Sequence, residues 1–328
     1  MDYAGLMMVP ARQEMAAEAP GARIVTVGEE EADRRLDNFL IARLKGVPRA
    51  HVYRIIRSGE VRVNSRRAGP QQRLEPGDRV RIPPVRLSRD TGAAALRPDT
   101  AGWIEARILH ENDELLVLDK PAGLAVHGGS GVRLGVIELL RIARPDARSL
   151  GLVHRLDRDT SGCLLLAKKP SSLRQLHAQF REGRVEKTYL ALLAGRMKTS
   201  QRLVDAPLLT SERRGGERWV RVDAAGKPAQ TRFVVERRYP GATLARVTLL
   251  TGRTHQIRVH AASIGLPLVG DPRYGERPDR LASGIGLHRL FLHATALAFA
   301  CPRDGRPIRV ESPLPVELET ALQRLAEM

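Results

Sequence analysis

The sequence predicts an α+β protein with a large, mixed, mostly antiparallel sheet and a small basic domain near its N-terminus. Three observations support this prediction. Short candidate strands outnumber candidate helices after residue 103 and do not alternate with them regularly, as a doubly wound parallel sheet would require. Residues 34–84 are strongly basic and have their own apolar periodicity. A stretch rich in Pro, Ala, Gly, Thr and Asp, without periodicity, separates the two parts.

The N-terminal part begins with residues 1–22, which are rich in Ala, Glu and Met and are expected to form a mobile leader. Residues 23–84 are predicted to form the small domain. Apolar residues at helical spacing predict one helix over 36–44 and a second around 52–56, which Gly59 ends as a C-cap. Two alternating segments, Val61–Asn64 and Arg79–Ile82, predict strands, with a turn at Pro76-Gly77-Asp78.

Residues 85–103 are interpreted as a linker, and residues 104–328 as the larger domain. The predicted strands of this domain are Ile104–Ile108, Leu115–Leu118, Cys163–Ala167, Lys187–Leu193, Trp219–Val222, Thr231–Glu236, Thr243–Leu250, Leu290–Ala300 and Ile308–Glu311. The predicted helices are Val132–Ala143, Ser171–Arg181, Thr254–Ile264, with Thr254 as N-cap, and Val316–Ala326.

The charge of the chain indicates a polyanionic partner. Lys and Arg number 54 against 37 Asp and Glu, a net charge of +17, and residues 34–84 contribute 13 basic and 4 acidic residues of these. Such an excess favours nucleic acid or an anionic membrane surface. No apolar run is long enough to span a bilayer and no secretory signal is recognisable, so nucleic acid is the preferred prediction. Cys163 and Cys301 lie in apolar runs with neither disulfide nor zinc spacing, which favours buried thiols and the cytoplasm.

The segment His154–Gly162 carries the strongest chemical signal. It interleaves Asp157 and Asp159 with arginines and ends in a turn-forming Ser-Gly. Fixed positive charges favour the ionised form of a carboxylate, which could then act as a nucleophile, a base or a metal ligand. Asp159 is the better candidate for a structural turn. Asp157-Arg158-Asp159 resembles the start of a magnesium phosphatase signature, but the position of Thr160 and the polar residues before Asp157 argue against that class.

Three further segments could contribute to a site. The loop Lys120–Gly129 is rich in Pro and Gly, and its backbone could approach a ligand or simply form a turn. Tyr189 lies on a predicted strand, where its ring could belong to the core or stack on a base. The segment Thr251–His260 collects donors near a helix start, which suits a phosphate, an ion pair with Asp157 or a merely solvated basic helix.

Taken in order, His154–Gly162, Lys187–Tyr189, Gly252–His260 and Leu290–Ala294 resemble the ribosomal-RNA branch of the pseudouridine synthases. The basic domain is similar to an S4 RNA-binding domain. The resemblance runs from about Ile24 to the C-terminus, with Ser200–Arg218 as a variable segment. It implies the pseudouridine synthase fold with an S4 (αL-like) domain, and isomerisation of uridine to pseudouridine in 23S ribosomal RNA or a large-subunit assembly intermediate. It implies no cofactor and no metal. Nothing in the sequence indicates membrane association or more than a monomer, so a cytoplasmic monomer is expected.

The resemblance also implies roles for individual residues. Asp157 would be the catalytic carboxylate, by attack on the ribose C1′, abstraction of the 2′ proton or attack on C6 of the base. Arg258 would hold Asp157 ionised and oriented, and Tyr189 would stack on the flipped uracil and accept the C5 proton. The expected substrate pocket consists of Leu292, Arg155, Arg158, His154, Thr160, Gly252, Arg253 and His255. The expected RNA-binding residues of the S4 domain are Arg49, Arg54, Arg57, Arg62, Arg66 and Arg67.

Three alternatives remain, one for the substrate and two for the class of protein. The resemblance favours several uridines of 23S rRNA over the single intersubunit stem-loop that a sister type of synthase modifies. A non-catalytic S4-type ribosome-assembly factor would bind RNA without modifying it, and a metal-dependent phosphatase would require magnesium. The set Asp157, Tyr189 and Arg258 disfavours the non-catalytic alternative.

Overall fold

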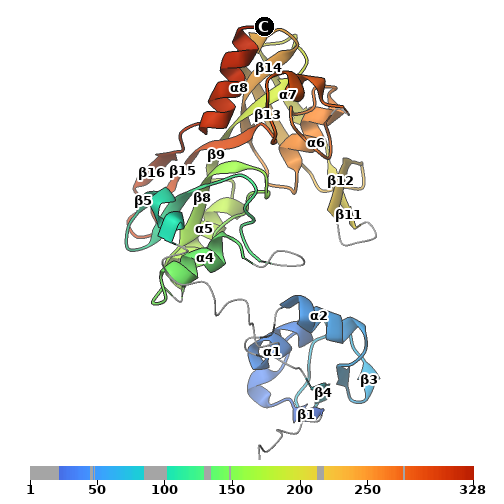
Figure 1. The fold of residues 1–328 in the computed structure, drawn as a ribbon. Helices are drawn as coiled ribbons and strands as arrows, with labels where there is room; N and C mark the ends of the chain where they lie inside the picture. The colour runs from blue at the N-terminus through green and yellow to red at the C-terminus, as the bar shows by residue number, and fades with distance from the viewer. Residues whose placement is uncertain are drawn as a thin grey trace, which may run out of the picture. The chain divides into compact units, whose positions relative to one another are not determined.

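The fold is taken from a computed structural model of the 328-residue chain, in which residues 22–44, 47, 49–84, 102–128, 134–147, 149–212, 218–275 and 278–328 are described. The chain divides into two compact units, residues 1–94 and 95–328 (Figure 1). The predicted leader, except residue 22, and the predicted linker, except residues 102 and 103, lie outside the described residues.

The first unit is a four-stranded sheet with two helices. The strands run in the order β1-β4-β2-β3, and all their pairings are antiparallel. Leu36, Phe39 and Val52 are among the helix residues that bury their side chains against Val63 and Val80 of the sheet. The elements are β1 (Arg23–Thr26), a 3-10 turn (Glu29–Glu31), α1 (Leu36–Arg43), α2 (Arg49–Arg57), β2 (Arg62–Val63), β3 (Arg66–Arg67) and β4 (Arg79–Ile82).

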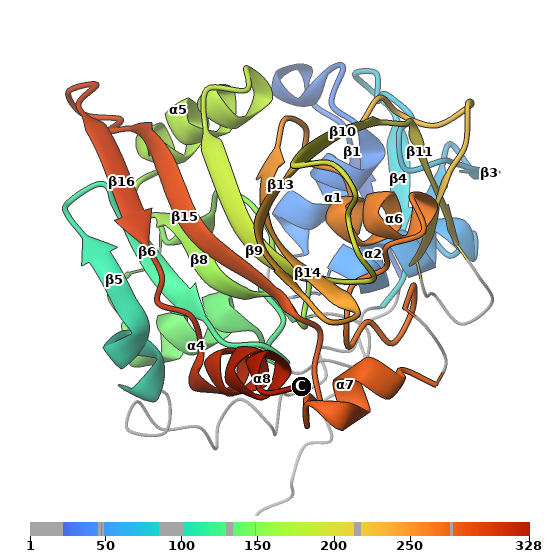
Figure 2. The same cartoon turned by 90° about the horizontal axis from the view of Figure 1, so that it is seen from above.

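The second unit is built on a ten-stranded sheet, which runs from β5 and β16 at one end to β13 and β10 at the other (Figure 2). The described pairings are antiparallel except that of β8 with β15. A separate hairpin consists of β11 (Leu208–Glu212) and β12 (Arg218–Val222). The strands of the large sheet are β5 (Ile108–Glu111), β6 (Leu115–Lys120), β7 (Gly151–Leu152), β8 (Ser161–Ala167), β9 (Glu186–Ala194), β10 (Gln201–Asp205), β13 (Gln230–Tyr239), β14 (Ala242–Leu249), β15 (Leu292–Ala300) and β16 (Pro307–Glu311).

Helices cover both faces of this sheet, so its central strands are buried on both sides. On one face, Tyr189 and Ala191 of β9 belong to a core that includes side chains of α4 and α6. On the other face, Leu192 packs with side chains of α7 and α8. The alternation of side chains along a strand therefore assigns the odd-numbered residues of β9 to the α4 and α6 face. The helices are α4 (Val136–Ala143), α5 (Pro170–Arg181), α6 (Gln256–Ser263), α7 (Arg280–Gly284) and α8 (Val316–Ala326).

The mixed, mostly antiparallel sheet confirms the predicted fold class, but some elements differ from the prediction. Residues Gly102–Arg107 form a 3-10 helix, so the predicted strand at Ile104 is wrong, and β5 begins at Ile108. The N-cap of α6 is His255 and not Thr254. The predicted helix start at Val132 is wrong, because the helix begins at Val136 after the N-cap Gly135, whose backbone is extended. The elements β1, β3, β7, β10, β11 and α7 were not predicted.

Candidate active site

A cavity of about 560 Å³ lies on the face of the sheet that carries Tyr189. Its walls come from the loop before β8, the end of α5, the strand β9, the segment between β14 and α6, and the start of β15. Ten residues predicted for the site line it: His154, Arg155, Asp157, Thr160, Tyr189, Gly252, Arg253, His255, Arg258 and Leu292. A volume of this order is typical of ligand pockets, so the fold brings motifs from distant parts of the chain to one binding cavity.

Asp157 projects from the loop between β7 and β8, and its side chain is 18% exposed. The backbone N–H of Thr160 donates to the carbonyl of Asp157, which tightens the loop. Gly162 follows with φ +107°, and a Cβ there would overlap the backbone carbonyl of Ala294 on β15. Only glycine combines this conformation with so close an approach. The Ser-Gly end of the motif therefore lets β8 pair with β15 directly after the Asp157 loop.

Arg258 is held mainly by a second carboxylate, Asp271. Its Nε and Nη2 donate to the two carboxylate oxygens of Asp271 at 2.8 and 2.6 Å, and the Asp271 side chain is fully buried. The remaining nitrogen, Nη1, lies 3.8 Å from Oδ2 of Asp157. Burial raises the pKa of Asp271, but the hydrogen bonds and charge of Arg258 outweigh burial and lower it overall. Arg258 therefore faces Asp157 from a position that the buried Asp271 fixes.

His255 provides a second nitrogen near Asp157, with Nε2 at 3.9 Å from Oδ2. The backbone of His255 is left-handed, with φ +54°, a conformation that costs energy for a non-glycine residue and is concentrated at functional sites. Its Nδ1 lies 2.9 Å from the hydroxyl of Tyr274, which also accepts the N–H of Val220 from the β11–β12 hairpin. Burial lowers the pKa of His255, while the charge of Asp157 opposes that shift.

The buried Gln256 fixes the segment that leads into α6. Its Oε1 accepts hydrogen bonds from the Thr251 hydroxyl and from the N–H of Arg253. Its Nε2 donates to the carbonyl of Gln230 and to the hydroxyl of Thr231. All four interactions use one side chain, so Gln256 ties the loop over Gly252 and Arg253 to β13 and sets where α6 begins.

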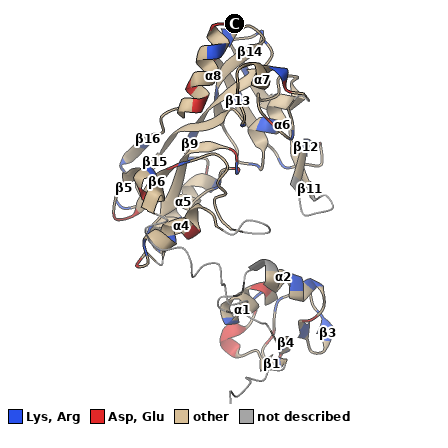
Figure 3. Ribbon diagram, viewed as in Figure 1, with Lys and Arg blue, Asp and Glu red and all other residues tan. Residues whose placement is uncertain are grey.

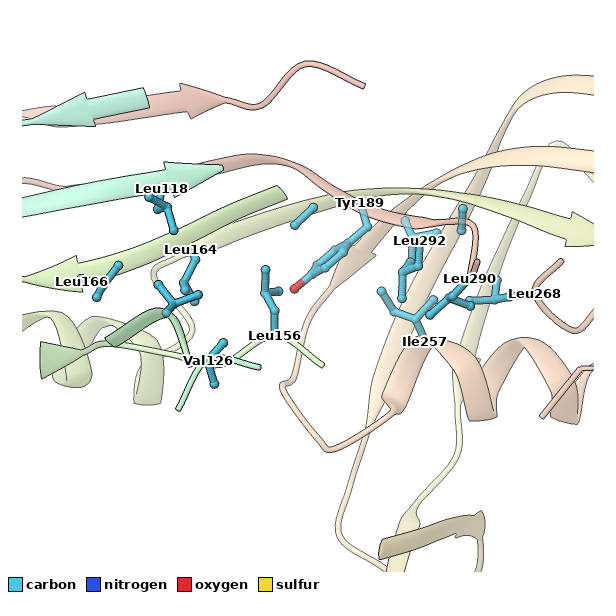
Figure 4. Packing of buried hydrophobic residues seen from close by; sticks show 14 of the residues in the cluster. Leu118, Val126, Leu156, Leu164, Leu166, Tyr189, Ile257, Leu268, Leu290 and Leu292 are labelled. Carbon is cyan, nitrogen blue, oxygen red and sulfur yellow. The ribbon is translucent and has the colours of Figure 1, made fainter. Parts of the chain in front are cut away.

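Tyr189 and Leu292 form the apolar wall of the cavity. Figure 4 shows the Tyr189 ring between Leu156 on one side and Leu292 on the other, and all three belong to the same buried cluster as Ile257. Among the described residues, no partner is found for the Tyr189 hydroxyl. Burial raises the pKa of Tyr189, and the nearby charge of Asp157 raises it further. The free site therefore presents a neutral phenol beside an aspartate.

The buried Lys120 supports the Asp157 loop from behind. Its Nζ donates to the carbonyls of Pro121, Leu124 and Arg158 at 2.8, 2.8 and 2.9 Å. Burial lowers the pKa of Lys120 to about 7, although the charges of Asp159 and Asp157 raise it. This single side chain links the Pro/Gly loop after β6 to the segment that carries Asp157.

Two of the predicted pocket residues have structural contacts. His154 accepts the N–H of Leu165 at its Nε2, stacks on Phe180 at 5.0 Å, and burial lowers its pKa to about 4. It lines the cavity as a neutral ring. Arg158 is not among the lining residues, and its Nε donates to the carbonyl of Gly123.

The arginines predicted for RNA binding lie on α2, β2 and β3 (Figure 3). Arg54, Arg57, Arg62, Arg66 and Arg67 have exposed side chains. In the described part of the chain none of the five pairs with a carboxylate, whereas Arg35, Arg43 and Arg73 of the same unit do. The side chain of Arg49 lies outside the described residues. The five described arginines therefore leave their charge available to a polyanion.

Sequence reasoning missed Asp271, Lys120, Gln256 and Tyr274. Asp271 follows Gly270, whose φ of +75° and contact with the carbonyl of Arg289 require glycine, so the Gly-Asp pair was a usable signal. Lys120 ends a strand that begins with four buried apolar residues, and a lysine buried there needs several acceptors. Nothing in the sequence alone indicated that Gln256 would serve four groups or that Tyr274 would reach His255.

Comparison with known proteins identifies the class. Residues 114–263 match the model of the RNA pseudouridylate synthase family, and residues 34–80 match the S4 domain. The chain belongs to the RNA pseudouridylate synthase family and carries an S4 domain, which confirms the resemblance found in the sequence motifs.

Individual relatives within this family match most of the chain. The ribosomal large subunit pseudouridine synthase C of Escherichia coli (strain K12) is 52% identical over 315 residues, which cover 95% of this chain and 99% of that protein. The protein of the same name from Pasteurella multocida (strain Pm70) is 50% identical over 307 residues, covering 93% and 94%. The solved structure of human RNA pseudouridylate synthase domain containing 4 is similar with a TM-score of 0.58 and 27% identity, covering 70% of this chain and 96% of that one.

Proposed function

We propose that this enzyme isomerises uridine to pseudouridine at several positions in 23S ribosomal RNA. The observation that supports this most strongly is the placement of Asp157 in a cavity between Arg258 and His255, with Tyr189 and Leu292 forming the apolar wall. The substrate is proposed from the relatives, which are named as large-subunit pseudouridine synthases and align over nearly the whole chain.

The reaction breaks the N1–C1′ bond, rotates the base and forms a C5–C1′ bond. The C5 proton is lost to solvent, and N1 gains a proton, so the product is an isomer of the substrate. Three uses of Asp157 fit this change: attack on C1′, removal of the 2′ proton, and addition to C6 of the uracil. Each requires an ionised carboxylate near the sugar or base. The neighbouring Arg258 and His255 supply donors on the side of Asp157 that faces α6.

Tyr189 and Leu292 are proposed to hold the uracil. Their side chains are buried in the same cluster and line the cavity, so the flat base can pack between apolar surfaces. The raised pKa of Tyr189 keeps its hydroxyl protonated in the free enzyme. Tyr189 can accept the C5 proton only after its own phenolic proton has passed to another acceptor. Neutralising Asp157 in a covalent intermediate would ease this loss, because the charge of Asp157 is one of the causes that raise the pKa of Tyr189.

RNA binding is proposed to involve the pocket rim and the S4 domain together. Arg155 and Arg253 are exposed and line the cavity, where phosphates of the strand that carries the uridine can approach. A paired uridine must leave its stack before it can enter, which costs a few kcal/mol. Phosphate contacts by these residues, Arg158 and the S4 arginines would offset that cost and make binding depend on salt.

We further propose that the enzyme acts in the cytoplasm as a monomer. None of the helices among the described residues could cross a membrane. Sedimentation at working concentration tests the monomer directly, because a dimer would double the mass.

The proposed activity is tested with 23S rRNA transcripts that carry tritium at C5 of uridine. Pseudouridine formation releases this tritium to water, whereas RNA binding alone does not. We expect catalytic release by the wild-type protein and none above background by Asp157→Asn, with comparable RNA binding by both. Binding without any release from the wild-type protein would contradict the proposal and favour a non-catalytic role.

A further inference from the structure

Lys187 lies on the same face of β9 as Tyr189 and also lines the cavity. Residues two apart on a strand are separated by about 7 Å, so the two side chains mark different parts of one wall. The part near Lys187 is completed by Phe180, Arg181 and Gly183, which follow from the end of α5. The cavity therefore extends beyond the region around Asp157 and Tyr189.

The Lys187 side chain is an unusual group to bury. The residue is only 8% exposed, yet no hydrogen bond or ion pair of its ammonium group is found among the described residues. Its Nζ lies 5.9 Å from the centre of the Phe180 ring. A lysine is seldom buried unless a partner compensates for the lost water. The side chain thus lines a cavity with a donor group that no described residue uses.

The surrounding charges favour an anion as that partner. Arg155 and Arg181 line the same cavity and are exposed, and His154 next to Phe180 is neutral. Among the described lining residues, Asp157 is the single carboxylate, and Arg258 and His255 already face it. Apart from Asp157, the described lining of the cavity therefore offers cations without a compensating acid.

We propose that Lys187 binds a phosphate of the RNA strand beside the uridine that enters the cavity, and so fixes the position of that nucleotide relative to Asp157. The inference rests on the proposed function, because it requires a nucleotide in the cavity. It makes Lys187 a substrate-binding residue of the enzyme, distinct in its action from the residues around the base.

The test uses the full-length protein and a short RNA that contains one uridine converted by the wild type. Each phosphate around this uridine is replaced singly by a neutral methylphosphonate, and kcat/KM is measured for every RNA. We expect one linkage at which neutralisation lowers kcat/KM of the wild type by about tenfold or more, as expected for one charge-assisted hydrogen bond. Lys187→Met should lower kcat/KM of the unmodified RNA by a similar factor and show no further loss at that linkage.

Two additional variants serve as controls. Lys187→Gln keeps a polar side chain and should behave as Lys187→Met does. Lys198→Met removes the same charge from an exposed residue that does not line the cavity, so it should keep the full loss of kcat/KM at the critical linkage.

The salt dependence of RNA binding gives a second measure of the same contact. The slope of log Kd against log salt should fall by about one unit in Lys187→Met.

Each outcome bears on a separate claim. If the wild type converts uridine but tolerates a methylphosphonate at every nearby linkage, the proposal for Lys187 is wrong, whether or not the variants fold. The proposal is also wrong if a methylphosphonate at the critical linkage lowers kcat/KM by the same factor in the wild type and in Lys187→Met. If the wild type forms no pseudouridine in any rRNA, the proposed function itself fails.

Discussion

Asp157 acquires its surroundings from residues far away in sequence. Arg258 and His255 approach it from α6, and their positions depend on Asp271 and Tyr274. The resemblance of the sequence motifs to pseudouridine synthases predicted ten of the residues that line the cavity, and Arg158 is the predicted residue that does not. The motifs did not predict that Asp271 is the main partner of Arg258, since a carboxylate contact across 13 residues depends on how the intervening turn folds.

The first prediction concerns Asp157 itself. Asp157→Asn retains the size of the side chain but removes its charge, so turnover should fall to background while RNA affinity stays within about threefold, because phosphate contacts dominate affinity. Tritium release and filter binding on the same RNA check both parts. The matched variant Asp159→Asn, two residues further on, should keep most of its turnover. Turnover by Asp157→Asn at the wild-type rate would show that Asp157 takes no part in the chemistry.

A second prediction concerns Asp271, the buried partner of Arg258. Asp271→Asn leaves a buried guanidinium without its bidentate partner, and removing one member of a buried pair costs about 3–5 kcal/mol of stability. The lowered pKa of Asp271 means that its contribution is present near neutral pH and is lost as pH falls into the acid range. Urea unfolding at neutral and acid pH measures both effects. If the difference in unfolding free energy between the wild type and Asp271→Asn did not shrink in acid, this account would be contradicted.

A third prediction follows from the buried Lys120. Its pKa is about 7 in the folded chain and 10.5 ordinarily, so between these values the unfolded chain binds one more proton and rising pH favours folding. The unfolding free energy of the wild type relative to Lys120→Met should therefore rise by up to about 1.4 kcal/mol per pH unit above pH 7. Below pH 7 the difference should be flat. A flat difference up to pH 10 would show that the three carbonyls keep Lys120 charged.

At the level of elements, periodicity predicted most helices and long strands of the described residues. The helix α8 has the predicted bounds, and β8, β9 and β14 lie within one or two residues of them. These segments are buried on one or both faces, so their apolar pattern is long and clear. The misassigned segment at Ile104 buries a single side chain in a six-residue 3-10 helix, which is too short for periodicity to decide.

The order of strands could not be read from the sequence in the same way. The sequence gives no register for the pairing of β8 with β15, which joins Ser161 to His293 and Gly162 to Ala294. That pairing depends on Gly162, whose conformation and close contact are properties of the folded chain. The missed strands β3 and β7 have two residues each, so they exist because longer neighbours hold them.

Gly162 gives a prediction at this scale. Gly162→Ala places a Cβ against the carbonyl of Ala294 at a positive φ, so β8 and β15 cannot keep their pairing without a shift. We expect a lower melting temperature and a larger loss of turnover than of S4-dependent RNA binding. Gly241→Ala, at a residue that does not line the cavity, also has a positive φ but no atom within 4 Å of the added Cβ, and it separates conformational strain from the steric contact. Equal effects of the two variants would contradict the steric argument.

At the scale of the whole molecule, positive charge and chemistry are distributed between two units. The S4 domain carries five exposed arginines for which no carboxylate partner is found among the described residues, and the larger unit carries the cavity. Removal of residues 1–84 should weaken RNA binding and flatten its dependence on salt, while the melting transition of the larger unit remains. Salt titrations of binding and calorimetry check this. Unchanged affinity after the deletion would contradict an RNA-binding role of the S4 domain.

Individual arginines allow a finer version of this test. Arg62→Gln combined with Arg66→Gln removes two exposed charges that have no carboxylate partner among the described residues, and it should raise KM with little change in kcat. Arg73→Gln is the matched control, because Arg73 already pairs with Asp33 in the same unit. A larger rise in KM for Arg73→Gln than for the double variant would contradict the proposed RNA-binding surface.

The central claim is that Asp157 of this enzyme forms pseudouridine at several sites of 23S rRNA. The most direct measurement is primer extension across the whole 23S rRNA after carbodiimide modification, in cells that lack the gene and carry either the wild type or Asp157→Asn. We predict stops at several separated uridines, restored by the wild type alone. Stops confined to one stem-loop would contradict the proposed specificity, and identical patterns with both proteins would contradict the claim itself.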